Sequence, residues 1–169
     1  AVYYFNAANN TITKMPDTIA PAVDNIRFIP LSFGGHCDWL HCDPPQHFEV
    51  VSARIKDDDS GVALATVRLQ QATMDANNRI TTLGAIQTFN LSGPSPASEY
   101  RSPTISRSWF TQMGGATFTI TSTDVAGNSK TTDLYYFNAS DRSITLVPDA
   151  IPPSVSITSP LNNGVVLKG

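Results

Sequence analysis

The sequence predicts an all-β protein, folded as a two-sheet antiparallel β-sandwich of about seven strands. Three observations support this fold class. Thr, Ser, Val, Ile and Ala dominate the 169 residues, whereas charged residues make up only 15%. Windows rich in Glu, Lys and Leu, which favour helices, are absent, and short alternating runs are separated by frequent turn signals. With 41% hydrophobic residues, the chain can bury a substantial core.

Four of these strands are expected in the first half of the chain. Each is a run of apolar and β-branched residues bounded by residues that favour turns. The acidic segment KDDDS joins the second strand to the third, and MDANN joins the third to the fourth, so both connections are short enough for hairpins. The four expected strands are residues 22–30, 47–55, 61–72 and 79–90.

The second half of the chain contains the clearest strand, GATFTITSTD at residues 115–124. Apolar Ala, Phe and Ile alternate with Thr, which is typical of an antiparallel strand with one buried face. The turn DVAGNS then leads into a strand at residues 129–138, and the two strands are expected to form a hairpin. Residues 104–110 are expected to form a further short strand, preceded by a loop at residues 92–103.

Two nearly identical segments lie near the two ends of the chain. VYYFNAANNTITKMPDTIAPAV begins at Val2 and LYYFNASDRSITLVPDAIPPSV begins at Leu134, so they align without a gap at an offset of 132 positions. Repetition at a fixed period is typical of a tandem array. Because the repeated segment combines a strand, a small hairpin and a proline-containing linker, we interpret it as the junction between successive units.

This interpretation divides the chain into three parts. Residues 1–20 are the last hairpin and linker of a preceding repeat, residues 21–150 are one sandwich repeat with an insertion at 34–47, and residues 151–169 open a following repeat. Proline removes conformational freedom from the linker, so the units are expected to be joined semi-rigidly. Alanine at the aromatic positions would then loosen the junction more than it destabilises the sandwich. The aromatic residues expected at the inter-repeat junctions are Tyr3, Tyr4, Phe5, Tyr135, Tyr136 and Phe137.

Several of these segments resemble the bacterial Ig-like (BIg-type) repeats that occur in tandem in large secreted and cell-surface proteins. In that family a D-x-A-G-N turn joins the last two strands of a unit, and a Pro-x-Val-x-Ile-x-Ser-Pro segment opens the next one. The resemblance covers most of residues 21–169 and implies an Ig-like sandwich, although this unit is longer than the usual ~100 residues. The matching residues are Asp124, Ala126, Gly127 and Asn128 in the turn, and Pro153, Val155, Ile157, Ser159 and Pro160 in the opening segment.

The insertion GGHCDWLHCDPPQH contains every histidine and both cysteines of the chain. A disulfide between Cys37 and Cys42 would pin a surface loop, as expected in an oxidising compartment. Zinc is an alternative, because imidazole and thiolate are its preferred ligands, and reduced thiols are a third. The residues that would bind zinc are His36, Cys37, His41 and Cys42.

The acidic turns and the two linker copies offer ligands for calcium, a hard cation that takes several carboxylate and carbonyl oxygens. The alternative is structural: KDDDSG is a solvated turn between strands, Asp124 accepts backbone N–H bonds within its own turn, and Asn128 supplies a residue that tolerates left-handed geometry there. The fold is expected to require no cofactor. The residues that would hold calcium are Asp57, Asp59 and Asp124 in the turns, and Asp17 and Asp149 in the linker copies.

Trp39 is the aromatic residue best placed to bind a ligand such as a sugar, because it lies in the polar insertion. Trp109, beside Phe110, is expected to fill the core instead. The sequence has no G-x-S-x-G segment, no glycine-rich phosphate-binding loop and no recognisable pair of catalytic carboxylates. We therefore do not expect an enzyme.

The formal net charge of −3, with no basic run, argues against nucleic acid as a partner, and no stretch approaches the ~20 apolar residues of a membrane span. The resemblance implies an extracellular or bacterial cell-surface location. The expected function is that of a structural or adhesive repeat, a stalk or spacer whose partners are adjacent repeats or neighbouring subunits. Two alternatives remain: an accessory module that binds carbohydrate, protein or another ligand through the 34–47 insertion, and a subunit of an extracellular fibre joined by strand exchange.

Overall fold

The computed structural model describes residues 3–35, 44–93 and 99–148. It is mostly β, with 61% strand, antiparallel sheets and one short helix, so the predicted all-β class is confirmed. Within the described residues, no helix is long and apolar enough to cross a membrane.

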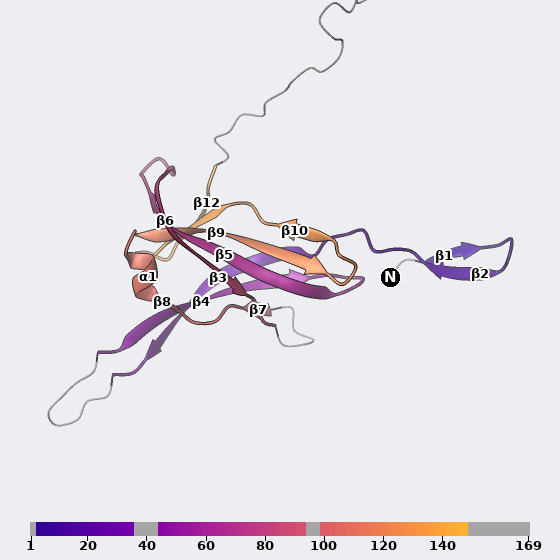
Figure 1. Ribbon diagram of the computed structural model, residues 1–169, viewed down its shortest axis with the longest axis horizontal. Coiled ribbons are helices and arrows are strands. Elements are labelled where there is room, and N and C mark those ends of the chain that lie inside the picture. Colours follow the sequence, from indigo (N-terminus) through magenta and orange to yellow (C-terminus); the bar gives the residue numbers. More distant parts are fainter. Residues whose placement is uncertain (1–2, 36–43, 94–98, 149–169) are drawn as a thin grey trace, which may run out of the picture.

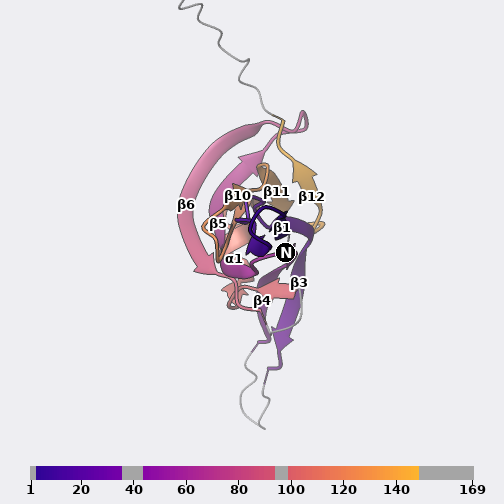
Figure 2. The ribbon, with the colours of Figure 1, turned by 90° about the vertical axis from the view of Figure 1, so that its right-hand side faces the viewer.

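The strands form two main antiparallel sheets and one separate hairpin (Figure 1). In the four-stranded sheet, β4 lies between β3 and β7 and also pairs with the short β8. The six-stranded sheet has the order β12-β11-β9-β5-β6, with β10 also paired to β9, and Figure 2 shows β6 and β12 at its opposite edges. The separate hairpin is β1 (Tyr3–Asn6) with β2 (Thr11–Lys14). The other bounds are β3 Ala22–Phe33, β4 Gln46–Lys56, β5 Val62–Met74, β6 Ile80–Asn90, β7 Glu99–Arg101, β8 Ile105–Ser106, α1 Arg107–Thr111, β9 Gly115–Asp124, β10 Ser129–Thr131, β11 Tyr135–Asn138 and β12 Ile144–Leu146.

Three segments differ from the sequence prediction. The expected loop at 92–103 contains β7, which is tied to β4 by the hydrogen bond from Ser52 Oγ to Glu99 Oε1 at 2.6 Å. The expected strand at 129–138 is interrupted between β10 and β11. There, the Thr132 hydroxyl accepts a hydrogen bond from the backbone N–H of Ile120 at 3.0 Å, where a continuous ladder would use a carbonyl.

The third difference concerns residues 104–110, which were expected to form one strand. Only the two residues of β8 are a strand, and the helix α1 follows them directly. No side chain caps the start of this helix, and its sequence favours strand over helix. Tertiary packing explains it: the ring of Phe110 is fully buried in the core. Trp109, predicted to fill the core, is only partly buried and packs edge-on against Phe110.

The hydrophobic core is one cluster that draws buried residues from both main sheets. Its centre is aromatic. The ring of Phe28 on β3 stacks on Phe137 of β11 with a centroid distance of 3.9 Å, and Phe110 and Phe118 meet Phe28 edge-on. β9 supplies Phe118 exactly where its alternation of apolar and hydroxyl residues predicts an inward-facing side chain.

The two copies of the YYFN hairpin have the same internal structure but different surroundings. Tyr3 pairs with Lys14 and Tyr135 pairs with Leu146, which is the same register at the 132-position offset. Asn10 and Arg142, which are also equivalent, both adopt a left-handed backbone with φ of 57° and 67°. β11–β12 belongs to the six-stranded sheet, whereas β1–β2 lies apart from both main sheets (Figure 1).

Burial separates the two copies further. Tyr4 and Phe5 are 56% and 55% exposed, whereas their equivalents Tyr136 and Phe137 are 5% and 1% exposed. Tyr135 is partly buried and stacks on Phe118. The aromatic residues of the second copy, expected at a junction, thus belong to the main core, because β11 pairs with the central strand β9. Alanine at Phe137 is therefore expected to destabilise the sheets directly, and not mainly to loosen a junction as the sequence predicted.

Candidate functional site

The segment that joins β2 to β3 is attached to the body of the protein by its own backbone. The carbonyl oxygen of Asp17 accepts a hydrogen bond from Asn128 Nδ2 at 3.0 Å, and that of Pro21 accepts one from Ser122 Oγ at 3.5 Å. Pro21 is buried. We call residues 15–21 the linker. Its backbone is hydrogen-bonded at Asp17 to the turn that follows β9, and at Pro21 to β9 itself.

The side chain of Asp17 makes a second attachment. Its Oδ1 accepts a hydrogen bond from the backbone N–H of Ile19 at 3.0 Å, and its Oδ2 accepts one from the N–H of Ser60 at 3.2 Å. The first bond shapes the linker, while the second joins it to the turn between β4 and β5. The linker is thus held at two turns that lie far apart in the sequence.

The turn between β4 and β5 is organised around Asp57. Its Oδ1 accepts hydrogen bonds from the backbone N–H groups of Asp59, Ser60 and Gly61, at 2.8–2.9 Å. Gly61 has a φ of +86°, a left-handed conformation that glycine adopts without strain. The KDDDSG segment is therefore the turn that the structural alternative predicted, and Asp57 shapes it.

The turn between β9 and β10 is organised around Asp124, which is only 2% exposed. Its two oxygens accept hydrogen bonds from the backbone N–H and the side-chain amide of Asn128, both at 2.8 Å. The prediction that Asp124 accepts a backbone hydrogen bond within its own turn is confirmed, whereas the left-handed geometry expected at Asn128 is not found. The left-handed residue is Gly127, with a φ of +93°, and Asn128 instead uses its amide to connect Asp124 with the linker.

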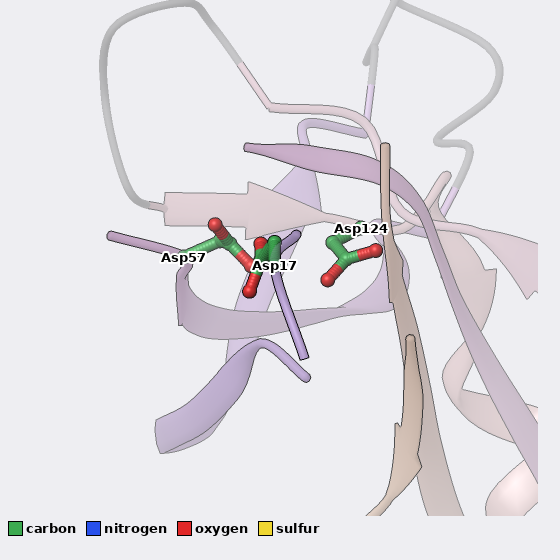
Figure 3. A group of neighbouring side chains, drawn as sticks. All are labelled: Asp17, Asp57 and Asp124. Carbon is green, nitrogen blue, oxygen red and sulfur yellow. The ribbon is translucent and has the colours of Figure 1, made fainter. Parts of the chain in front are cut away.

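These three aspartates meet at one place, although they come from three separate segments. One carboxylate oxygen from each of Asp17, Asp57 and Asp124 lies within 4.8 Å of the others. Figure 3 shows these three side chains. Asp59 lies beside this group and forms an ion pair with Lys14 Nζ at 3.6 Å. Asp149, the equivalent of Asp17 in the second linker copy, lies outside the described residues. We refer to Asp17, Asp57 and Asp124 as the aspartate cluster.

Hydrogen-bond donors offset the mutual repulsion of these carboxylates. The backbone N–H of Ile19, followed by Ser60, holds the pKa of Asp17 below its ordinary value, and the charge of Lys14 adds to this effect. Because the pKa is lower in the folded protein, the ionised carboxylate stabilises the folded state at neutral pH. That contribution is lost as the pH falls from the unfolded pKa of Asp through the lowered one.

The donor chemistry of the aspartate cluster fits calcium. Calcium prefers carboxylate and carbonyl oxygens and accepts irregular geometry, and Asp57 Oδ2 accepts no hydrogen bond among those described. The linker and the β4–β5 turn also line a surface cavity of about 320 Å³ beside Asp17 and Asp57. Since a water molecule takes up about 30 Å³, this cavity can hold a partly hydrated ion. The calcium hypothesis stays a prediction.

Removal of calcium should therefore lower the stability of the protein. With free calcium at 10 to 100 times its Kd, binding to the folded state adds about 1.5–3 kcal/mol to the free energy of unfolding. Asp57→Asn keeps the Oδ1 acceptor that the turn needs but removes a charge, so it should abolish the calcium response, whereas the exposed Asp58→Asn should retain it. Thermal unfolding in calcium, in magnesium and in a chelator measures this. Identical melting temperatures in all three would contradict calcium binding.

Several predicted site residues lie outside the described part of the chain: His36, Cys37, Trp39, His41 and Cys42. The disulfide, zinc and sugar-binding hypotheses therefore stay predictions. His47, the last histidine of the insertion, lies in β4, and its Nδ1 shares a hydrogen bond with Ser32 Oγ at 2.9 Å.

One buried ion pair is not predicted by any pattern in the sequence. Glu49 on β4 is 1% exposed, and its two carboxylate oxygens accept hydrogen bonds from Arg142 Nη1 and Nη2 at 2.6 and 2.9 Å. Arg142 Nη2 also donates to the carbonyl oxygen of Phe28 at 2.8 Å. The repeat shows only that Arg142 is charged where the other hairpin copy has Asn10.

No family model, no curated protein and no solved structure matches this chain. The arguments about function below therefore come from the sequence and the geometry of the chain.

Proposed function

We propose that this chain is a structural repeat, an Ig-like β-sandwich that acts as a semi-rigid spacer in a tandem array of a bacterial extracellular protein. The observation that carries this proposal is the pair of hairpins. One copy completes the six-stranded sheet, and the other, with the same register, is placed outside both sheets with its aromatic side chains exposed. A hairpin that ends one unit and precedes the next accounts for both copies.

The sandwich arrangement is supported by the shared core. Phe28 on the four-stranded sheet contacts both Phe118 and Phe137 on the six-stranded sheet, and the buried residues of both sheets belong to one cluster. Two antiparallel sheets with their apolar faces together are the usual way for such strands to bury a core. The DVAGNS turn between β9 and β10 agrees with the Ig-like repeats that the sequence resembles.

The attachment of the linker is what would make such a spacer stiff. A flexible linker lets adjacent units rotate freely, whereas a linker that is hydrogen-bonded to the following unit removes this freedom. Asp17 connects to Ser60 through its side chain and to Asn128 through its backbone, so the chain leaves β2 and enters β3 along a fixed path. The aspartate cluster is thus a clamp on the linker, with or without a cation.

Loss of the Asp17 side chain should release the β1–β2 hairpin from the body of the protein. In the wild-type chain, the backbone amides of β1–β2 should tumble with those of the main sheets, with order parameters of about 0.85. Asp17→Ala removes the bonds to Ser60 and Ile19, so the order parameters of the hairpin should fall below about 0.6 while those of β9 stay unchanged. NMR relaxation of the ¹⁵N-labelled full chain measures both.

Asp58→Ala is the matched control, because Asp58 lies in the same acidic turn and is exposed. It should leave the relaxation of the hairpin unchanged. Independent tumbling of β1–β2 in the wild-type chain would refute the semi-rigid spacer.

A further inference from the structure

The exposed aromatic face of β1–β2 is equivalent to a face of β11–β12 that is buried. Tyr4 and Phe5 occupy the positions of Tyr136 and Phe137 in an identical register. The second pair is buried against the body of its unit. A surface with the same residues in the same arrangement needs the same kind of cover, namely the edge of a β9-like strand above an aromatic core.

The place where β11 docks is shaped for close approach. β11 pairs with the first residues of β9, and Asn138 lies opposite Gly115. A Cβ at Gly115 would collide with the carbonyl oxygen of Phe137 and the ring of Tyr136, so glycine is required there. Phe137 then reaches Phe28 across the core. None of these contacts distinguishes the two hairpins, because both present tyrosine and phenylalanine at these positions.

One contact does distinguish them. The guanidinium of Arg142 satisfies the buried carboxylate of Glu49 with two hydrogen bonds. Among the described residues, no other side chain forms an ion pair with Glu49. We call the left-handed position of each hairpin, Asn10 in one and Arg142 in the other, the corner residue. An asparagine in the place of Arg142 is shorter and uncharged, so it would leave Glu49 buried without a cation, which is strongly unfavourable.

We propose that the left-handed corner residue of each hairpin selects the unit on which the hairpin docks. Arg142 directs β11–β12 to a body that carries Glu49, and Asn10 directs β1–β2 to a second copy of the repeat that has an uncharged residue in the place of Glu49. This inference rests on the proposed function in one respect: it takes residues 3–14 as the last hairpin of another repeat. Its consequence is that a hairpin from one unit is kept out of its neighbour, although the two hairpins are nearly identical.

The buried charge of Glu49 sets how strongly its unit prefers a hairpin with arginine over one with asparagine. Removal of one partner of a buried ion pair weakens docking by about 100- to 4000-fold. The covalent attachment of β11–β12 to its own body corresponds to an effective concentration on the order of millimolar. At about 0.1–1 mM protein, a hairpin from another molecule can therefore displace it only when the corner residue favours the exchange.

The test is to exchange the two corner residues in the full chain. In N10R/R142N, the β1–β2 hairpin carries the arginine and β11–β12 carries the asparagine. The β1–β2 hairpin of one molecule should then dock on the body of the next, and sedimentation velocity should show reversible chains that grow between about 10 µM and 1 mM. The wild-type chain, N10R and R142N should each stay monomeric, because in each of them no exchange brings arginine to an unpaired Glu49.

Glu49→Gln provides the matched control. In the N10R/R142N background, it removes the buried charge and with it the advantage of arginine, so the triple variant should return to the monomer. If R142N proves too unstable to fold alone, synthetic peptides covering residues 134–147, with Arg142 or with Asn at that position, are added to it. The arginine peptide should raise its melting temperature or restore its folding, and the asparagine peptide should not.

Equal association of R142N and N10R/R142N, a folded N10R/R142N that stays monomeric at 1 mM, or equal effects of the two peptides would overturn the proposal. These outcomes differ from a failure of the proposed function, which depends on the tumbling of β1–β2 in the wild-type chain. The hairpin can be mobile and still select its partner by charge.

Discussion

Phe137→Ala is expected to lower the free energy of unfolding by about 3–5 kcal/mol. The ring of Phe137 is fully buried, stacks on Phe28 and meets Phe110 edge-on at 5.4 Å, so its removal leaves a cavity at the meeting point of both main sheets. The surrounding strands cannot close this cavity without moving β11. Chemical denaturation of the full chain, followed by tryptophan fluorescence, measures the change.

The chain provides its own control for this substitution. Phe5 has the same neighbours in sequence and the same place in its hairpin, but it is exposed. Phe5→Ala should change the free energy of unfolding by no more than about 0.5 kcal/mol. Equal losses of unfolding free energy in the two variants would mean that β1–β2 is packed as firmly as β11–β12. That result would contradict the difference in burial between Phe5 and Phe137.

Gly115→Ala should have the second largest effect, a loss of about 3 kcal/mol or more. A methyl group at this position meets the backbone carbonyl of Phe137 and the ring of Tyr136, and neither can move aside while β11 stays paired with β9. The expected result is a lower melting temperature together with greater exposure of Tyr136, which hydrogen exchange of the β11 amides would report.

Gly34→Ala is the control for this change, because a Cβ at Gly34 meets no atom within 4 Å and its backbone is not left-handed. It should leave both the melting temperature and the exchange rates of β11 unchanged. A stable Gly115→Ala variant with slow exchange in β11 would show that the sheet can adjust at this point.

Strands with strong alternation could be predicted from the sequence, and weak local signals could not. β9 begins and ends where the GATFTITSTD pattern predicts, because its inward and outward residues differ clearly in hydrophobicity. β7 was missed because three residues, Glu99–Arg101, carry no periodic pattern. It forms through its pairing with β4, which is a tertiary contact.

The helix α1 also could not be predicted from local sequence. Its residues favour strand, and nothing in the five-residue segment marks a helix start. The deciding contact is the burial of Phe110 among Phe28 and Phe137, which come from distant parts of the chain. Local preference was therefore overruled by packing.

The aspartate cluster was predictable in its members but not in its geometry. Asp17, Asp57 and Asp124 each follow from a linker or turn pattern, and each pattern indicates an oxygen ligand or a turn cap. Their meeting depends on how the linker folds back toward two turns, which no local pattern contains.

The small size of β12 has a mechanical consequence for a chain under tension. When the two termini are pulled apart, the force reaches the six-stranded sheet at Val147, which follows the three-residue edge strand β12 and donates its backbone N–H to the carbonyl oxygen of Leu134 at 2.9 Å. Because β12 runs antiparallel to β11, we expect a force that draws Val147 away from Leu134 to load the hydrogen bonds one at a time, from Val147 toward Ile144. Peeling then stops at Arg142, whose guanidinium is anchored to Glu49 in the other sheet. We therefore expect β12 to detach at low load while the core, with Phe137 at its centre, stays folded.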